Sequence, residues 1–283
     1  MKQFTARLIV ISLVISCTTG GSSVSPRSPA VPAPISQPTD RGPWTLSYRS
    51  DTLRYQVIRS ASIESQRDSA VHREISTNNT HEIVSLAVAG DSVRYTAVVD
   101  SFSTATQGLV GPVQPVNLPI EVSGTVDSLG LNIDSTATDE QCNPLRSSLE
   151  SDVRNLLISL PLQLSPGTSW RDSSVTATCL GSIPAKAIII RHFVVTGATT
   201  YTNESTVTIQ RTDSISAQGE GRQQQHQLKI EISGTGSATY YISVGKGHVV
   251  HLATSEDLSF VVKSASRTDH LRESVKEEFS LLP

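Results

Sequence analysis

The sequence predicts a mainly β fold: a long-stranded antiparallel curved sheet or incomplete barrel, covered by one α-helix at about residues 144–160. Apolar and polar residues alternate in several segments, which places the apolar side chains on one face of a strand. Gly- and Asp-containing turns separate these segments. Several segments exceed ten residues, and long strands in succession favour a curved sheet, since a long flat edge invites aggregation.

The first alternating segment is "TLRYQVIRSASIE", in which Leu53, Tyr55, Val57, Ala61 and Ile63 share one face. One-sided strands of this kind are usually antiparallel. The same pattern returns at Val84, Leu86 and Val88; at Val93, Tyr95, Ala97 and Val99; at Leu228, Ile230 and Ile232; and at Leu258, Phe260 and Val262. Turns are expected at 89–92, 127–130, 219–222 and 244–248, where Gly and Asp gather.

One segment has helical spacing instead. Asn143 is the expected N-cap, Pro144 occupies the first helical position, and Pro161 ends the helix. The apolar stripe of this helix needs a partner, and covering the open face or the mouth of the curved sheet would provide one. The stripe consists of Leu145, Leu149, Val153, Leu156, Leu157 and Leu160.

Cys142 directly precedes this helix, and Cys179 closes the strand that follows it. We expect the two to form a disulfide, because a two-cysteine metal site would need a CxxC or HxxxH spacing that is absent. Residues 44–283 then form a single β-rich domain, or two meander halves, 44–134 and 182–281, around a helix–disulfide unit at 142–179. The last segment, 269–282, fits a helix or a strand, and the neighbouring strands favour a closing strand.

The amino end has the three parts of a secretion signal. Lys2 and Arg7 supply positive charge, residues 8–15 are nearly all apolar, and a small Ser16 follows. A helix needs roughly twenty apolar residues to span a bilayer, so this run is too short to be a permanent anchor. Residues 1–16 are therefore expected to be a signal peptide.

The segment Val14-Ile15-Ser16-Cys17 resembles the lipobox of bacterial lipoproteins, although leucine is commoner where Val14 stands. The resemblance implies a lipoprotein signal peptide at 1–16 and lipidation of Cys17 by diacylglycerol and a further acyl chain such as palmitate. The resulting protein would be lipid-anchored in the bacterial cell envelope. Thr18 after the cysteine implies sorting to the outer membrane, facing the periplasm, in a diderm host. Residues 17–43, rich in Pro and Ser, would form an extended tether reaching roughly 80 Å.

Charge and motifs argue against several activities. The mature chain would carry 21 basic against 26 acidic residues, and no basic patch is visible, so nucleic acid is not an expected partner. No GxSxG elbow or Gly-rich phosphate loop occurs. Ser243 and Lys246 match SxxK but lack its companion motifs, and His248 and His251 would point to opposite faces of a strand. We therefore expect no enzymatic activity, no cofactor and no metal.

Two functions remain open from the sequence. In the first, the lipoprotein binds or carries a hydrophobic ligand in a curved-sheet cavity under the helix. This layout is similar to that of half-barrel lipid-carrier lipoproteins of bacterial envelopes, without a shared motif. In the second, a structural or interaction lipoprotein has a solid core and binds another envelope component. The presence of an apolar cavity of several hundred Å³ under the helix discriminates between them.

Overall fold

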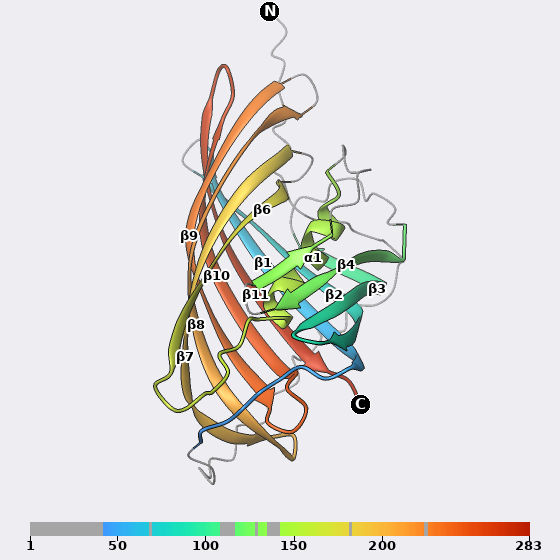
Figure 1. The fold of residues 1–283 in the computed structure, drawn as a ribbon. Helices are drawn as coiled ribbons and strands as arrows, with labels where there is room; N and C mark the ends of the chain where they lie inside the picture. The colour runs from blue at the N-terminus through green and yellow to red at the C-terminus, as the bar shows by residue number, and fades with distance from the viewer. Residues whose placement is uncertain are drawn as a thin grey trace, which may run out of the picture.

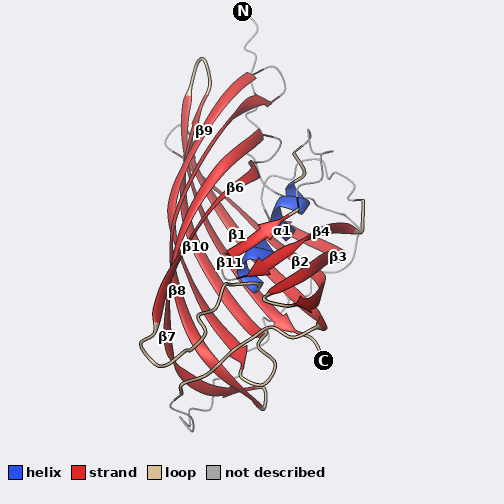
Figure 2. Ribbon diagram, in the orientation of Figure 1, coloured by secondary structure: helices blue, strands red, loops and turns tan. Residues whose placement is uncertain are grey.

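The computed structural model describes residues 42–67, 70–107, 117–127, 130–134, 142–180, 183–223 and 226–283. These residues form one antiparallel sheet and one helix, α1 (Pro144–Leu156), as Figures 1 and 2 show. The strands are β1 (Asp51–Arg67), β2 (Ala70–Ala89), β3 (Ser92–Gln107), β4 (Ile120–Asp127), β5 (Gly130–Ile133), β6 (Ser169–Leu180), β7 (Ile183–Tyr201), β8 (Glu204–Gln223), β9 (His226–Ser243), β10 (Val249–Lys263) and β11 (Thr268–Leu281). The predicted fold class is confirmed.

The sheet consists of two meanders, β1–β5 and β6–β11. They are joined by pairing of β1, the first strand of one, with β11, the last strand of the other. The strand order of the sheet is β5-β4-β3-β2-β1-β11-β10-β9-β8-β7-β6. The joining pair runs from Tyr55 opposite Leu281 to Ser65 opposite Leu271. The last segment is therefore a strand, as favoured by the sequence. The second meander was predicted to begin at residue 182, but it also includes β6, because the whole of β6 pairs with β7.

The sheet curls until its two edge strands, β5 and β6, approach each other without pairing. Helix α1 lies in this gap and contacts β3, β4 and β6 (Figure 1). We call the gap between β5 and β6 the seam. The sheet is thus an incomplete barrel, and the helix takes the place of the missing strand pairing.

The helix begins as the sequence predicts and ends earlier. Asn143 Oδ1 accepts hydrogen bonds from the backbone N–H groups of Leu145 and Arg146, both at 3.1 Å, which satisfies two donors of the first turn. Its predicted end at 160 is wrong, since helical geometry stops at Leu156. The Leu157 N–H still bonds to Val153 O at 2.8 Å, and from there an irregular segment leads to β6.

Side chains on the inner face of the sheet form two apolar clusters. The larger surrounds α1 and includes Tyr55, Phe193, Tyr240 and Phe279. The smaller lies toward the opposite ends of the strands and contains Ile183, Ala187, Ala217, Leu228, Ile230, Ile232 and Val262. Most of the residues predicted to share the inner face belong to one of these clusters.

The outer face of the sheet is polar along β8 and β9. On β8, exposed Gln210, Thr212 and Ser214 alternate with the buried residues of the inner face. Exposed Ser233, Thr235 and Ser237 do the same on β9. A sheet with one apolar and one polar face packs on its core from one side and meets water on the other.

Three of the four predicted turns connect strands. They join β2 to β3, β4 to β5 and β9 to β10. The turn predicted at 219–222 is wrong, because these residues continue β8 and pair with β7 or β9. A Cβ on Gly219 would lie 3.0 Å from Ala185 Cβ and from Pro184 O, so glycine here permits the close approach of two strands.

Candidate functional site

The seam is held together by contacts between the start of α1 and the end of β6. Cys142 and Cys179 form the predicted disulfide. Next to it, Ser147 Oγ on the helix accepts the backbone N–H of Cys179 at 3.1 Å and lies 3.3 Å from Thr178 Oγ1. The helix therefore binds one edge strand covalently and also satisfies part of its unpaired backbone.

The space between α1 and the sheet is filled by side chains. Leu149 and Val153 are fully buried, Leu156 is almost so, and all three belong to the larger apolar cluster. A pocket beside the helix, lined by Val57, Phe102 and polar neighbours, has a volume of about 20 Å³. That volume holds about one water molecule, so it cannot accept an acyl chain.

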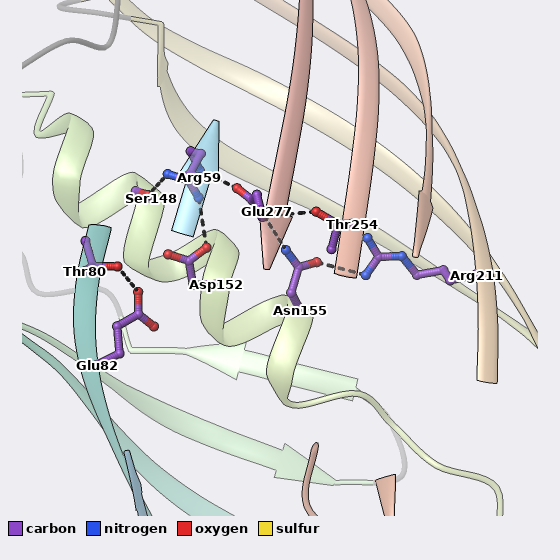
Figure 3. A network of polar contacts seen from close by, with 9 residues as sticks. All are labelled: Arg59, Thr80, Glu82, Ser148, Asp152, Asn155, Arg211, Thr254 and Glu277. Carbon is purple, nitrogen blue, oxygen red and sulfur yellow. Dashed lines mark hydrogen bonds and ion pairs between the residues drawn. The ribbon is translucent and has the colours of Figure 1, made fainter. Parts of the chain in front are cut away.

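A polar network crosses the interior between the two apolar clusters (Figure 3). Arg59, on the inner face of β1, is its centre. Its Nη2 lies 2.9 Å from Asp152 Oδ1 of the helix. Its Nε donates to Glu277 of β11, and its Nη1 donates to Ser148 of the helix. Arg59 thus ties the helix to the strand pair that joins the two meanders.

A second arginine extends the network to the opposite wall. Arg211 of β8 donates through Nη1 to Asn155 Oδ1 of the helix at 2.9 Å and to the hydroxyl of Tyr240. It also forms an ion pair with Asp213 at 2.8 Å, in which both side chains are about 1% exposed. Asn155 donates in turn to Glu277 Oε2 at 3.5 Å. The helix is therefore fixed to three distant strands through charge-assisted hydrogen bonds.

The buried network holds several carboxyl groups whose pKa is raised. Burial raises the pKa of Glu82 well above its usual value, and the neighbouring Asp152 carboxylate raises it further. Burial also raises the pKa of Asp152 to about 6, although Arg59 opposes the shift. Thr80 Oγ1 donates to Glu82 Oε1 at 3.4 Å, while Glu82 Oε2 has no hydrogen-bond partner, so burial in this network favours the neutral acid. Burial likewise raises the pKa of Glu256 and of Glu273 to about 7.

The outward side of α1 borders a polar cleft along the seam. This cleft, which we call the seam cleft, has a volume of about 650 Å³ and is bounded by β5, the helix and β6. Three arginines line it, Arg146, Arg154 and Arg191. Arg146 pairs with Glu150 at 3.1 Å, and Arg191 Nη1 lies 3.6 Å from Asp172 Oδ2. Hydroxyl groups of Ser173, Ser174, Thr176 and Thr178 complete the β6 wall.

Two of these arginines have a lowered pKa. For Arg154 and for Arg191, burial is the main cause of the lowered pKa. Arg191 lowers the pKa of Arg154 further, and Arg211 does the same to Arg191. Like charges are therefore close together along this side of the cleft.

The predicted site residues have different outcomes. Cys17, the lipobox and nearly all of the tether lie outside the described residues. Ser243 donates to Glu204 Oε1 at 2.5 Å, and Lys246 Nζ lies 3.9 Å from the same oxygen, so the SxxK residues share a carboxylate instead of forming a serine–lysine pair. In the described part of the chain, no three His, Cys, Asp or Glu side chains are placed to hold a metal ion.

Sequence reasoning missed Arg59, Arg211 and their partners. The alternation of apolar and polar residues along β1 and β8 contains the signal that could have identified them. Arg59 occupies an inward position between Val57 and Ala61, and Arg211 and Asp213 interrupt the inward series from Ile209 to Ile215. A charged residue at an inward position predicts a buried ion pair, because an unpaired charge there costs several kcal/mol.

Comparisons with known proteins identify no family. No known family and no curated protein matches the chain. The sheet aligns weakly with an outer membrane channel from Pseudomonas putida F1, at a TM-score of 0.25 and 6% identity over 86% of this chain and 100% of the channel. OccK2 of Pseudomonas aeruginosa aligns with a TM-score of 0.23 and 6% identity. This alignment covers 82% of this chain and 98% of OccK2. OpdQ of the same organism aligns with a TM-score of 0.23 and 7% identity. This alignment covers 83% of this chain and 100% of OpdQ.

TM-scores this low carry no inference about the function of this chain. Within the described residues, no helix has the length and apolar character needed to cross a bilayer.

Proposed function

We propose that the chain is a non-enzymatic lipoprotein of the bacterial envelope, anchored through Cys17, that binds another envelope component in the seam cleft. The observation that carries this proposal is the contrast between the two sides of α1. The inner side is packed against the core, whereas the outer side borders a polar cleft of about 650 Å³. A cleft with a few convergent polar groups on a rigid scaffold is the usual form of a binding site.

The filled interior is the reason to prefer an interaction lipoprotein to a carrier. A carrier of hydrophobic ligands would need an apolar cavity of several hundred Å³ under the helix. The apolar side chains of α1 occupy that place, and Arg59 and Arg211 attach the helix to the sheet. Opening such a cavity would separate buried ion pairs, which costs about 3–5 kcal/mol for each pair broken.

Two further features support an envelope location. The Cys142–Cys179 disulfide fits a compartment outside the cytosol, where disulfides persist. The lipobox at Val14–Cys17 would supply the anchor, and the Pro- and Ser-rich segment up to residue 43 would separate the domain from the membrane.

Site-specific photo-crosslinking in cells tests the binding function. A photo-crosslinking amino acid at Thr176, in the seam cleft, should give a discrete adduct with an envelope component. The same amino acid at Ser216, exposed on the outer face of β8, is the matched control and should give none. Adducts of equal yield from both positions would contradict a binding role for the cleft.

Lipid analysis of the purified protein separates this function from the carrier. Mass spectrometry should find acyl groups on the amino-terminal cysteine and no further lipid bound to the chain. One non-covalent lipid per chain would instead favour the carrier.

A further inference from the structure

The inner end of the seam cleft contains polar atoms that no protein group satisfies. Arg191 is about 5% exposed, yet its Nε has no hydrogen-bond partner, and the same holds for Ser174 Oγ on the neighbouring strand β6. Both residues line the cleft. A buried donor without a partner costs about 1–3 kcal/mol, more when it is charged, so such atoms call for a ligand.

The charges around these atoms favour an anionic ligand. Asp172 lies 3.6 Å from Arg191, which is too long for a hydrogen bond. Glu150 pairs with Arg146. Within the described residues, Arg154 has no ion pair or hydrogen bond of its own, so its guanidinium donors remain available to a ligand. The third acid of the cleft, Asp134, lies on the β5 side and accepts a hydrogen bond from Ser123.

We propose that Arg154, Arg191 and Ser174 form a binding site for an oxyanion, either a phosphate or a carboxylate, at the inner end of the seam cleft. Two guanidinium groups and a hydroxyl are the donor set that such anions prefer, because the guanidinium fork matches a pair of anion oxygens. The anion bonds to the free Nε of Arg191 and the hydroxyl of Ser174, and it separates the two like charges. This proposal rests on the seam cleft being the binding site of the chain, and it specifies the chemistry recognised there.

Anion-dependent thermal stability tests the site. The mature lipidated chain in detergent is titrated with inorganic phosphate, dimethyl phosphate or acetate, with sodium chloride keeping the ionic strength constant. Unfolding is followed by the fluorescence of Trp44 and Trp170. A ligand that binds only the folded state raises Tm with its concentration. Inorganic phosphate represents a free anion, dimethyl phosphate a lipid headgroup, and acetate a carboxylate.

We expect at least one of these anions to raise Tm saturably, and the most potent one identifies the source. Arg154→Gln and, as a milder change, Ser174→Ala should each raise the apparent Kd at least tenfold. Arg171→Gln is the matched control, since Arg171 is exposed on the outer side of the same strand β6, and its response should equal that of the wild type.

Two results would overturn the oxyanion site. One is that none of the three anions raises Tm above the chloride reference. The other is that Arg154→Gln and Ser174→Ala both respond as the wild type does. Because the titration uses purified protein without a partner, either result leaves the crosslinking test of the cleft unaffected, and the two proposals fail separately.

Discussion

Replacing Glu82 by Gln should remove a pH dependence of folding. Burial raises the pKa of Glu82 well above its usual value, whereas an unfolded glutamate releases its proton near pH 4.5. Between that pH and its raised folded pKa, the folded state binds one proton more than the unfolded state. The free energy of unfolding therefore falls as pH rises through this range. Gln cannot ionise, so the variant lacks this proton uptake.

The size of the effect follows from one proton. Each proton that the folded state holds in excess changes the free energy of unfolding by at most about 1.36 kcal/mol per pH unit, and this limit applies up to the raised pKa of Glu82. The Glu82→Gln variant should therefore lose less stability than the wild type as pH rises from 5 to 7.

Urea unfolding of the oxidised protein at pH 5, 6 and 7, followed by tryptophan fluorescence, measures this difference. Glu121→Gln, at an exposed position of β4, removes the same group outside the network and is the matched control. If the curves of stability against pH run parallel for Glu82→Gln and the wild type, the raised pKa of Glu82 is refuted.

Four further changes have defined outcomes. Arg59→Met should lower the free energy of unfolding by about 3–5 kcal/mol, measured in urea, because Asp152 and Glu277 lose their buried partner; a loss below 1 kcal/mol would contradict this. Replacing both Cys142 and Cys179 by Ala should cost about 2–5 kcal/mol and expose the seam to limited proteolysis, whereas an unchanged cleavage pattern would show that the helix holds β6 alone. Asn143→Ala should cost about 1 kcal/mol in the same assay, with Asn132→Ala as a control, since it removes two capping hydrogen bonds. Cys17→Ala should abolish labelling by radioactive palmitate, and the variant should leave the membrane fraction. A variant that keeps its label would exclude Cys17 as the anchor.

The sequence predicted most of the strands because only one face of the sheet is buried. Where the inner face is apolar, as from Leu53 to Val57, the alternation marks both the strand and its orientation. The predicted disulfide and helix start depend on local signals: two cysteines remain once Cys17 is assigned, and Asn143 precedes Pro144. These features required no knowledge of the distant strands.

Local sequence patterns could not predict the polar network. Arg59 and Glu277 lie opposite each other because β1 pairs with β11, and Asp152 reaches them from the helix, so contacts far apart in the sequence bring the three together. Gly219 was misread for a related reason. Glycine is the expected residue in a turn, but here the neighbouring strand leaves no room for a side chain, and that requirement is visible only in three dimensions.

The pairing of β1 with β11 has a consequence for biogenesis. The contact between Tyr55 and Leu281 joins positions near opposite ends of the domain, and contacts so distant along the chain slow the folding of β-rich proteins. If the chain emerges amino end first, whether from the ribosome or from an export channel, one edge of β1 lacks its neighbour until β11 has emerged. During that interval the incomplete sheet is prone to aggregation.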